Sequence, residues 1–106
     1  MRIQLDPVKD LPQEGDGKGK VLLLADGREI AIFRKDGKFF AIDNLCPHEG
    51  GPLGEGAVNG NCVTCPWHGW QFDITTGKGQ NLWEENVKSY PIEVENEAVF
   101  LIVDKR

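Results

Sequence analysis

Short apolar runs separated by turn residues occupy both ends of the chain and predict β-strands. In the first half, these runs cover residues 20–25, 28–34 and 38–43. Asp26 and Gly27 separate the first run from the second, and Asp36 and Gly37 separate the second from the third. Asp-Gly pairs between apolar runs favour tight hairpin turns. This half of the chain therefore predicts two successive β-hairpins.

The C-terminal part has the same kind of pattern. Residues 88–95 and 98–104 are strand-like, and Asn96 and Glu97 between them indicate a third hairpin. Near the N-terminus, residues 2–6 alternate between polar and apolar and predict an edge strand. We find no apolar spacing typical of an amphipathic helix of three turns, so we expect an all-β fold.

The middle of the chain, residues 44–79, has a different composition. It holds eight of the thirteen glycines, all three cysteines and both histidines. Within it, only residues 57–64 and 70–74 are strand-like. We therefore expect one domain over the whole chain, in which this segment is a site-bearing excursion from a β scaffold.

The composition excludes several classes of function. The chain has 106 residues and a net charge of −5, which argues against binding to nucleic acid or to an anionic membrane surface. No apolar run approaches the roughly 20 residues that span a bilayer. The N-terminus lacks the apolar core of a signal peptide, and three cysteines do not suggest a disulfide framework. We therefore expect a reducing, cytoplasmic setting. We also expect a monomer.

Two short Cys/His motifs carry the candidate chemistry. The first is C-P-H at 46–48, the second is C-P-W-H at 65–68, and sixteen residues separate them. Zinc fingers pair like ligands, with two cysteines in one motif and two histidines in the other. Here each motif holds one cysteine and one histidine. That interleaving suits a Rieske [2Fe–2S] cluster, in which one iron has two cysteine ligands and the other has two histidines.

The pattern C-P-H-x16-C-P-W-H-G-W resembles the Rieske iron–sulfur family, and the resemblance covers nearly the whole chain. Within that family, the chain is similar to the small soluble Rieske ferredoxins of bacterial ring-hydroxylating dioxygenases and multicomponent monooxygenases. The resemblance implies a Rieske-like antiparallel β-sandwich base formed by residues 1–43 and 80–106, with a smaller cluster-binding β subdomain inserted at 44–79. It also implies an electron carrier, not an enzyme, between a flavin-dependent ferredoxin reductase and a terminal oxygenase.

By the same resemblance, one [2Fe–2S] cluster is the cofactor. Cys46 and Cys65 would bind one iron, and His48 and His68 would bind the other through Nδ1. Electrons would then enter and leave through the exposed histidine edges.

The residues around these motifs would allow the backbone and apolar side chains to pack closely around a cluster. Gly50 and Gly69 let the backbone turn N–H groups toward sulfur. Leu53, Trp67 and Trp70 are expected to give the cluster an apolar surround, although ordinary core packing explains Trp70 equally well. The full set expected around the ligands is Gly50, Pro52, Leu53, Trp67, Gly69, Trp70 and Phe72. Of these, Pro52, Leu53 and Trp67 are expected to form an apolar contact ring for a docked partner.

The resemblance also predicts a low reduction potential. Quinol-oxidising Rieske proteins have a disulfide between the two loops, but Gly50 and Trp67 occupy those cysteine positions here. The same proteins place Ser and Tyr hydroxyls where this chain has Trp70 and Phe72. Without these hydrogen-bond donors, more electron density stays on sulfur and reduction is disfavoured.

Two alternative functions stay open at this point. The chain could be the small subunit of an assimilatory nitrite reductase, which shares the fold, or a zinc-stabilised binding module. Cys62 forms a C-x-x-C pair with Cys65, but we interpret it as a small buried residue on the preceding strand. Many related ferredoxins have a proline-containing third loop near the cluster. Residues 75–89 contain no proline, and Trp83 is a candidate replacement for that cover.

Overall fold

The computed structural model describes residues 1–5, 12, 17, 19–47, 50–67, 69–80 and 85–104. Over these residues the regular structure is ten strands and one short 3-10 turn, so the all-β prediction is confirmed. The elements are β1 Arg2–Gln4, β2 Lys20–Leu23, β3 Glu29–Lys35, β4 Lys38–Asp43, η2 Leu53–Glu55, β5 Ala57–Asn59, β6 Cys62–Thr64, β7 Gln71–Asp73, β8 Ser89–Tyr90, β9 Ile92–Glu95 and β10 Ala98–Ile102.

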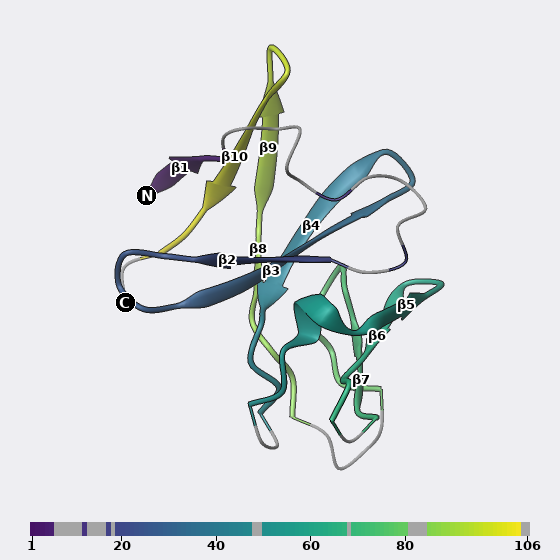
Figure 1. Ribbon diagram of the computed structural model, residues 1–106. Coiled ribbons are helices and arrows are strands. Elements are labelled where there is room, and N and C mark those ends of the chain that lie inside the picture. The colour runs from purple at the N-terminus through teal and green to yellow at the C-terminus, as the bar shows by residue number, and fades with distance from the viewer. Residues whose placement is uncertain are drawn as a thin grey trace.

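The strands form three antiparallel sheets. Two of them build the base, with strand orders β1-β10-β9 and β2-β3-β4-β8. The third has the order β5-β6-β7 and lies at the opposite end of the molecule from the β9–β10 hairpin (Figure 1). As predicted, β1 is an edge strand, since it pairs only with β10.

The predicted hairpins are present, and the backbone explains their turn residues. Lys35 pairs with Lys38, which leaves Asp36 and Gly37 as a two-residue turn with φ of 52° and 76°. A turn with positive φ at both central residues matches the right-handed twist of the strands. Asn96 and Glu97 form the same kind of turn between β9 and β10, with φ of 50° and 69°.

Two segments predicted as single strands are divided in the structure. Residues 57–64 form the hairpin β5–β6, because Gly60, with φ of 59°, turns the chain between them. Residues 88–95 are divided at Pro91, which lacks the N–H needed to continue a ladder. After this division β8 pairs with β4 in one base sheet, whereas β9 pairs with β10 in the other. Pro91 therefore marks the crossing between the two base sheets.

The side chains of β3 and β4 supply both hydrophobic cores. Ala31, Phe33 and Ile42 belong to the core that extends toward the β5-β6-β7 sheet. The alternate residues Ile32 and Ala41 belong to the core shared with β1, β9 and β10. Because successive side chains of a strand point to opposite faces, one central sheet is buried on both sides. This arrangement fixes the position of the inserted subdomain on the base.

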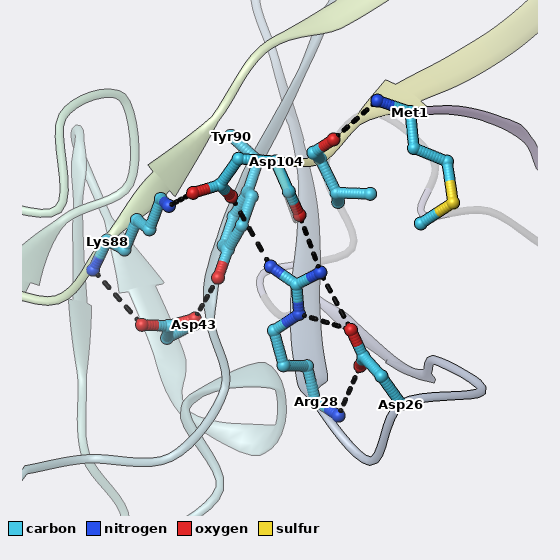
Figure 2. A network of polar contacts seen from close by, with 8 residues as sticks. Met1, Asp26, Arg28, Asp43, Lys88, Tyr90 and Asp104 are labelled. Atoms are coloured by element: carbon cyan, nitrogen blue, oxygen red, sulfur yellow. Dashed lines mark hydrogen bonds and ion pairs between the residues drawn. The ribbon is translucent and has the colours of Figure 1, made fainter. Parts of the chain in front are cut away.

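A polar network joins the C-terminal segment to the end of β4 (Figure 2). The hydroxyl of Tyr90 donates a hydrogen bond of 2.6 Å to Asp43, and the backbone N–H of Lys88 donates to the same carboxylate at 3.2 Å. The ammonium group of Lys88 binds Asp104, and this contact lowers the pKa of that carboxyl group. Arg28 donates to the backbone carbonyl of Asp104 at 2.9 Å. The network thus holds the chain at the point where it enters the candidate site.

Tyr90 is the only tyrosine of the sequence, so its ionisation can be followed without interference. Burial, and then the hydrogen bond to Asp43, raise the pKa of Tyr90 to about 12, above the ordinary value of 10.0. Because the protonated form is favoured in the folded state, this contribution to stability is complete below pH 10 and is lost as the pH rises from about 10 to about 12. We expect the tyrosinate absorbance of the folded protein to appear with a midpoint near pH 12. A midpoint near pH 10 without unfolding would contradict the contact.

Candidate metal centre

The first candidate loop begins directly after β4 and contains Cys46. Its backbone N–H donates to the carbonyl of Gly51 at 2.9 Å, and its carbonyl accepts from the N–H of Gly50 at 2.7 Å. Gly50 has φ of 77°, a left-handed conformation that strains any residue with a Cβ. The glycine expected at this position is therefore required by the turn itself.

The second candidate loop connects β6 to β7 and has the same closure. The N–H of Cys65 donates to the carbonyl of Trp70 at 2.7 Å, and the carbonyl of Cys65 accepts from Gly69 at 3.0 Å. Gly69 has φ of 76°, almost the value of its counterpart in the first loop. The two cysteines thus occupy equivalent positions in two matched turns. His48 and His68 lie outside the described residues, as do Glu49 and Trp83.

The two loops touch each other at Gly51. A Cβ added to this glycine would lie 2.7 Å from Sγ of Cys65 and 3.1 Å from Cγ of Trp67. Cys46 and Cys65 are each 2% exposed, and neither of them forms a disulfide. Two thiols shielded from water on matched, contacting turns fit a metal group that needs two thiolates on one iron. When bound, a [2Fe–2S] cluster supplies one-electron redox chemistry at such a place.

Cys62 differs from the two loop cysteines, as the sequence suggested. It lies on β6 opposite Asp73, away from both loops in the sheet register, and it is partly exposed, not buried as expected. Local burial, and then the charge of Asp73, raise the pKa of its thiol. A raised pKa disfavours the thiolate that metal binding requires.

The apolar residues around the loops divide into buried and exposed ones. Leu53 is fully buried at the start of η2, so its expected place in a surface contact ring is wrong. It packs in the core between the base and the insert, together with Phe72. Trp70 is partly buried and packs against that core, which favours the structural interpretation of this residue. Pro52 is partly buried and forms an isolated bridge with Leu45.

The exposed apolar side chains beside the loops are Leu45 and Trp67, at 48% and 56% exposure. Trp67 was expected at this surface, whereas Leu45 was missed. Its position directly before Cys46 was the available signal. Exposed large apolar side chains next to a candidate centre indicate a contact surface.

Comparison with known protein families decides the classification. Residues 2–91 match the Rieske [2Fe-2S] domain model. The chain belongs to the Rieske [2Fe-2S] domain family. The Rieske domain binds a [2Fe–2S] cluster, so the cofactor predicted from the two motifs is confirmed. Among the described residues of this Rieske domain, no helix is long and apolar enough to cross a membrane.

Several relatives of this Rieske domain are small proteins that it matches over most of their length. The ferredoxin component of the naphthalene 1,2-dioxygenase/salicylate 5-hydroxylase systems of Ralstonia sp is 37% identical over 93 residues, 87% of this chain and 86% of that protein. A ferredoxin of Sphingomonas yanoikuyae B1 superposes with a TM-score of 0.77 at 30% identity, over 87% of this chain and 91% of its own. A putative NADH-dependent nitrite reductase small subunit of Mycobacterium tuberculosis superposes with a TM-score of 0.80 at 25% identity, over 95% and 93%.

Proposed function

We propose that this Rieske protein is a low-potential one-electron carrier that takes electrons from a flavin-dependent reductase and delivers them to a terminal oxygenase. The observation that carries the proposal is the pair of matched cysteine turns, in a chain that matches a dioxygenase ferredoxin over most of the length of both. A monomeric state and a cytoplasmic location complete the proposal, together with a single domain whose cluster-binding insert spans residues 44–79.

The ligand set is part of this proposal. Cys46 and Cys65 would bind one iron of the cluster, and His48 and His68 would bind the other. The equivalent hydrogen bonds of the two turns support the pairing of the cysteines. The sequence contains only two histidines, so this ligand set leaves none for a mononuclear iron site with two histidines and a carboxylate. The chain itself would therefore carry electrons and not oxidise a substrate.

The proposal of a low reduction potential is based on the disulfide and hydroxyl groups that the residues around the two motifs cannot provide. Gly50 and Trp67 cannot form a disulfide between the loops, and Trp70 and Phe72 offer no hydroxyl group to a sulfur atom. The side chain of Phe72 is fully buried in the core, as an apolar residue at this position should be. Without these hydroxyl donors, the added electron is less stabilised and the potential lies at the lower end of the range for Rieske clusters.

Leu45 and Trp67 provide the surface through which a partner would dock. Both side chains are exposed on the loops that hold the cysteines, so a partner seated on them would approach the cluster closely. The acidic balance of the chain would favour a partner with a basic surface. Glu55 is exposed at the end of η2 and is available for such steering, although an ordinary solvated charge explains it as well.

A redox titration tests the proposed function. We expect a rhombic EPR signal on reduction and a midpoint potential below about 0 mV at pH 7, within the Rieske range of about −150 to +300 mV. A midpoint above about +100 mV would contradict delivery of electrons to an oxygenase. A colourless protein that contains one zinc ion would contradict the whole assignment.

The small subunit of an assimilatory nitrite reductase is the second candidate function. It is supported by the superposition with the mycobacterial small subunit, which extends over nearly the whole of both chains. Reduction of the purified protein by a ferredoxin reductase of a dioxygenase system, measured by stopped-flow absorbance, separates the two candidates. The zinc-stabilised binding module has no support from the family to which the chain belongs.

A further inference from the structure

Asn44 is a buried polar residue at the base of the first cysteine loop. The residue is 1% exposed, and among the described residues no other amide or charged residue is buried. It lies between the end of β4 and Cys46. Burial of an amide is costly unless its hydrogen bonds are satisfied, so the contacts of this residue indicate what it does.

Asn44 makes hydrogen bonds in two opposite directions. Toward the base, its Nδ2 donates to Oε1 of Glu29 at 3.0 Å, and its backbone N–H donates to the Glu29 carbonyl at 2.9 Å. Toward the returning end of the loop, its Oδ1 accepts from the N–H of Gly54 at 2.7 Å, and its carbonyl accepts from Leu53 at 2.7 Å. The residue therefore joins the end of the loop to the start of β3.

The two cysteine loops differ in what holds their ends together. The second loop is closed by a regular ladder, in which Thr64 of β6 pairs with Gln71 of β7. The first loop has no such ladder, because its ends lie between β4 and η2 and share only the isolated bridge between Leu45 and Pro52. The side-chain hydrogen bonds of Asn44 are found at the ends of the first loop, where the second loop has paired strands. Without the side-chain bonds of Asn44, the described ends of the first loop would be joined only by the backbone hydrogen bonds of that bridge, from Leu53 to Asn44 and from Cys46 to Gly51.

The contact between Asn44 and Gly54 is also tight. A Cβ on Gly54 would lie 3.0 Å from Oδ1 of Asn44 and 2.7 Å from Cγ2 of Val21. The backbone of Gly54 therefore lies so close to the amide of Asn44 that a residue with a side chain would not fit at position 54. If the amide is removed, the N–H of Gly54 loses its partner in a buried place.

We infer that Asn44 is the positioning residue of the first cluster loop: its amide holds the two ends of the loop together and thereby sets the position of Cys46 at the cluster. This inference rests on the proposed function, because it assumes that Cys46 is a cluster ligand. Asn44 acts through the loop and does not itself touch the cluster.

The test compares Asn44→Ala with Val99→Ala in the cluster-loaded protein. Val99 is buried in the other core, so its truncation lowers the unfolding temperature without touching the loop. We expect Asn44→Ala to lose its visible absorbance to a chelator roughly tenfold faster than the wild type, and to shift and broaden the EPR g values of the reduced cluster. Val99→Ala should retain the wild-type EPR spectrum.

An exchange of partners tests the same contact without truncation. In Asn44→Asp, a carboxylate faces the carboxylate of Glu29, so the contact that was attractive becomes repulsive. In the double variant Asn44→Asp with Glu29→Gln, the new amide donates to the new carboxylate, and the second carboxylate oxygen still accepts from Gly54. We expect rapid cluster loss in the single Asn44→Asp variant, recovery to within about twofold of the wild type in the double variant, and little change in Glu29→Gln alone.

Two results would overturn the inference. One is that Asn44→Ala and Val99→Ala, compared at equal loss of unfolding temperature, show the same EPR spectrum and the same rate of cluster loss. The other is that the double variant loses its cluster as fast as Asn44→Asp, which also covers the case in which Asn44→Ala does not fold. Failure of the proposed function is a different result, since the wild-type protein would then lack the Rieske EPR signal.

Discussion

Replacement of Cys65 by serine is expected to abolish the visible absorbance of the purified protein. The thiol of Cys65 is buried and is a proposed ligand of the cluster, and a serine hydroxyl is a poor substitute for a thiolate on iron. The measurement is the visible spectrum together with the iron content per chain. We expect an iron content close to zero and a lower unfolding temperature, since metal binding in small domains contributes to folding.

Cys62→Ser is the matched control for that experiment. Cys62 is only three residues away, on β6, but its thiol is partly exposed, and neighbouring groups disfavour its thiolate form. The spectrum and iron content of this variant should stay near the wild-type values. If Cys62→Ser bleaches the protein while Cys65→Ser does not, the assignment of the second motif is wrong.

The second large effect is expected for Gly51→Ala. The added Cβ would lie 2.7 Å from Sγ of Cys65, closer than real Cβ contacts allow, so either the sulfur or the first loop must move. We expect most of the chains to be purified without iron, and any remaining cluster to show an altered EPR spectrum. The EPR spectrum would change because the sulfur of Cys65 is a proposed ligand of the cluster and cannot move freely.

Gly60→Ala provides the comparison for this second effect. Gly60 has φ of 59° in the β5–β6 turn, and a Cβ added to it would meet no atom within 4 Å. Alanine there costs about 1 kcal/mol of backbone strain and touches neither cysteine. We expect a lower unfolding temperature with a normal iron content. Equal iron loss in both variants would show that general destabilisation, and not the contact with Cys65, is responsible.

Much of the fold follows from local patterns in the sequence. The positive φ values at Asp36 and Asn96 belong to turns whose residue types and spacing predicted hairpins before any tertiary contact was known. The two Cys/His motifs predicted the family for a similar reason. Ligand type and spacing are local properties, and few other sites interleave cysteine and histidine in this way.

Features that depend on tertiary packing were not predicted. Leu53 was expected at the surface beside the cluster, but the short turn η2 places it in the core between the base and the insert. The division of residues 88–95 at Pro91 depends on which sheet each half joins, and the alternation of side chains does not contain that information. The role of Asn44 was also invisible, because its partner Glu29 is fifteen residues away along the chain.

The central position of β3 has a consequence for how the molecule denatures. Its alternate side chains supply both hydrophobic cores, so neither core can open without exposing one face of the same strand. Two halves that share a strand in this way do not melt separately, and unfolding is expected to be a single cooperative transition. The cluster-binding insert is therefore as stable to heat as the whole protein. Destabilising changes in the distant β9–β10 sheet are expected to lower the temperature at which the iron site is lost.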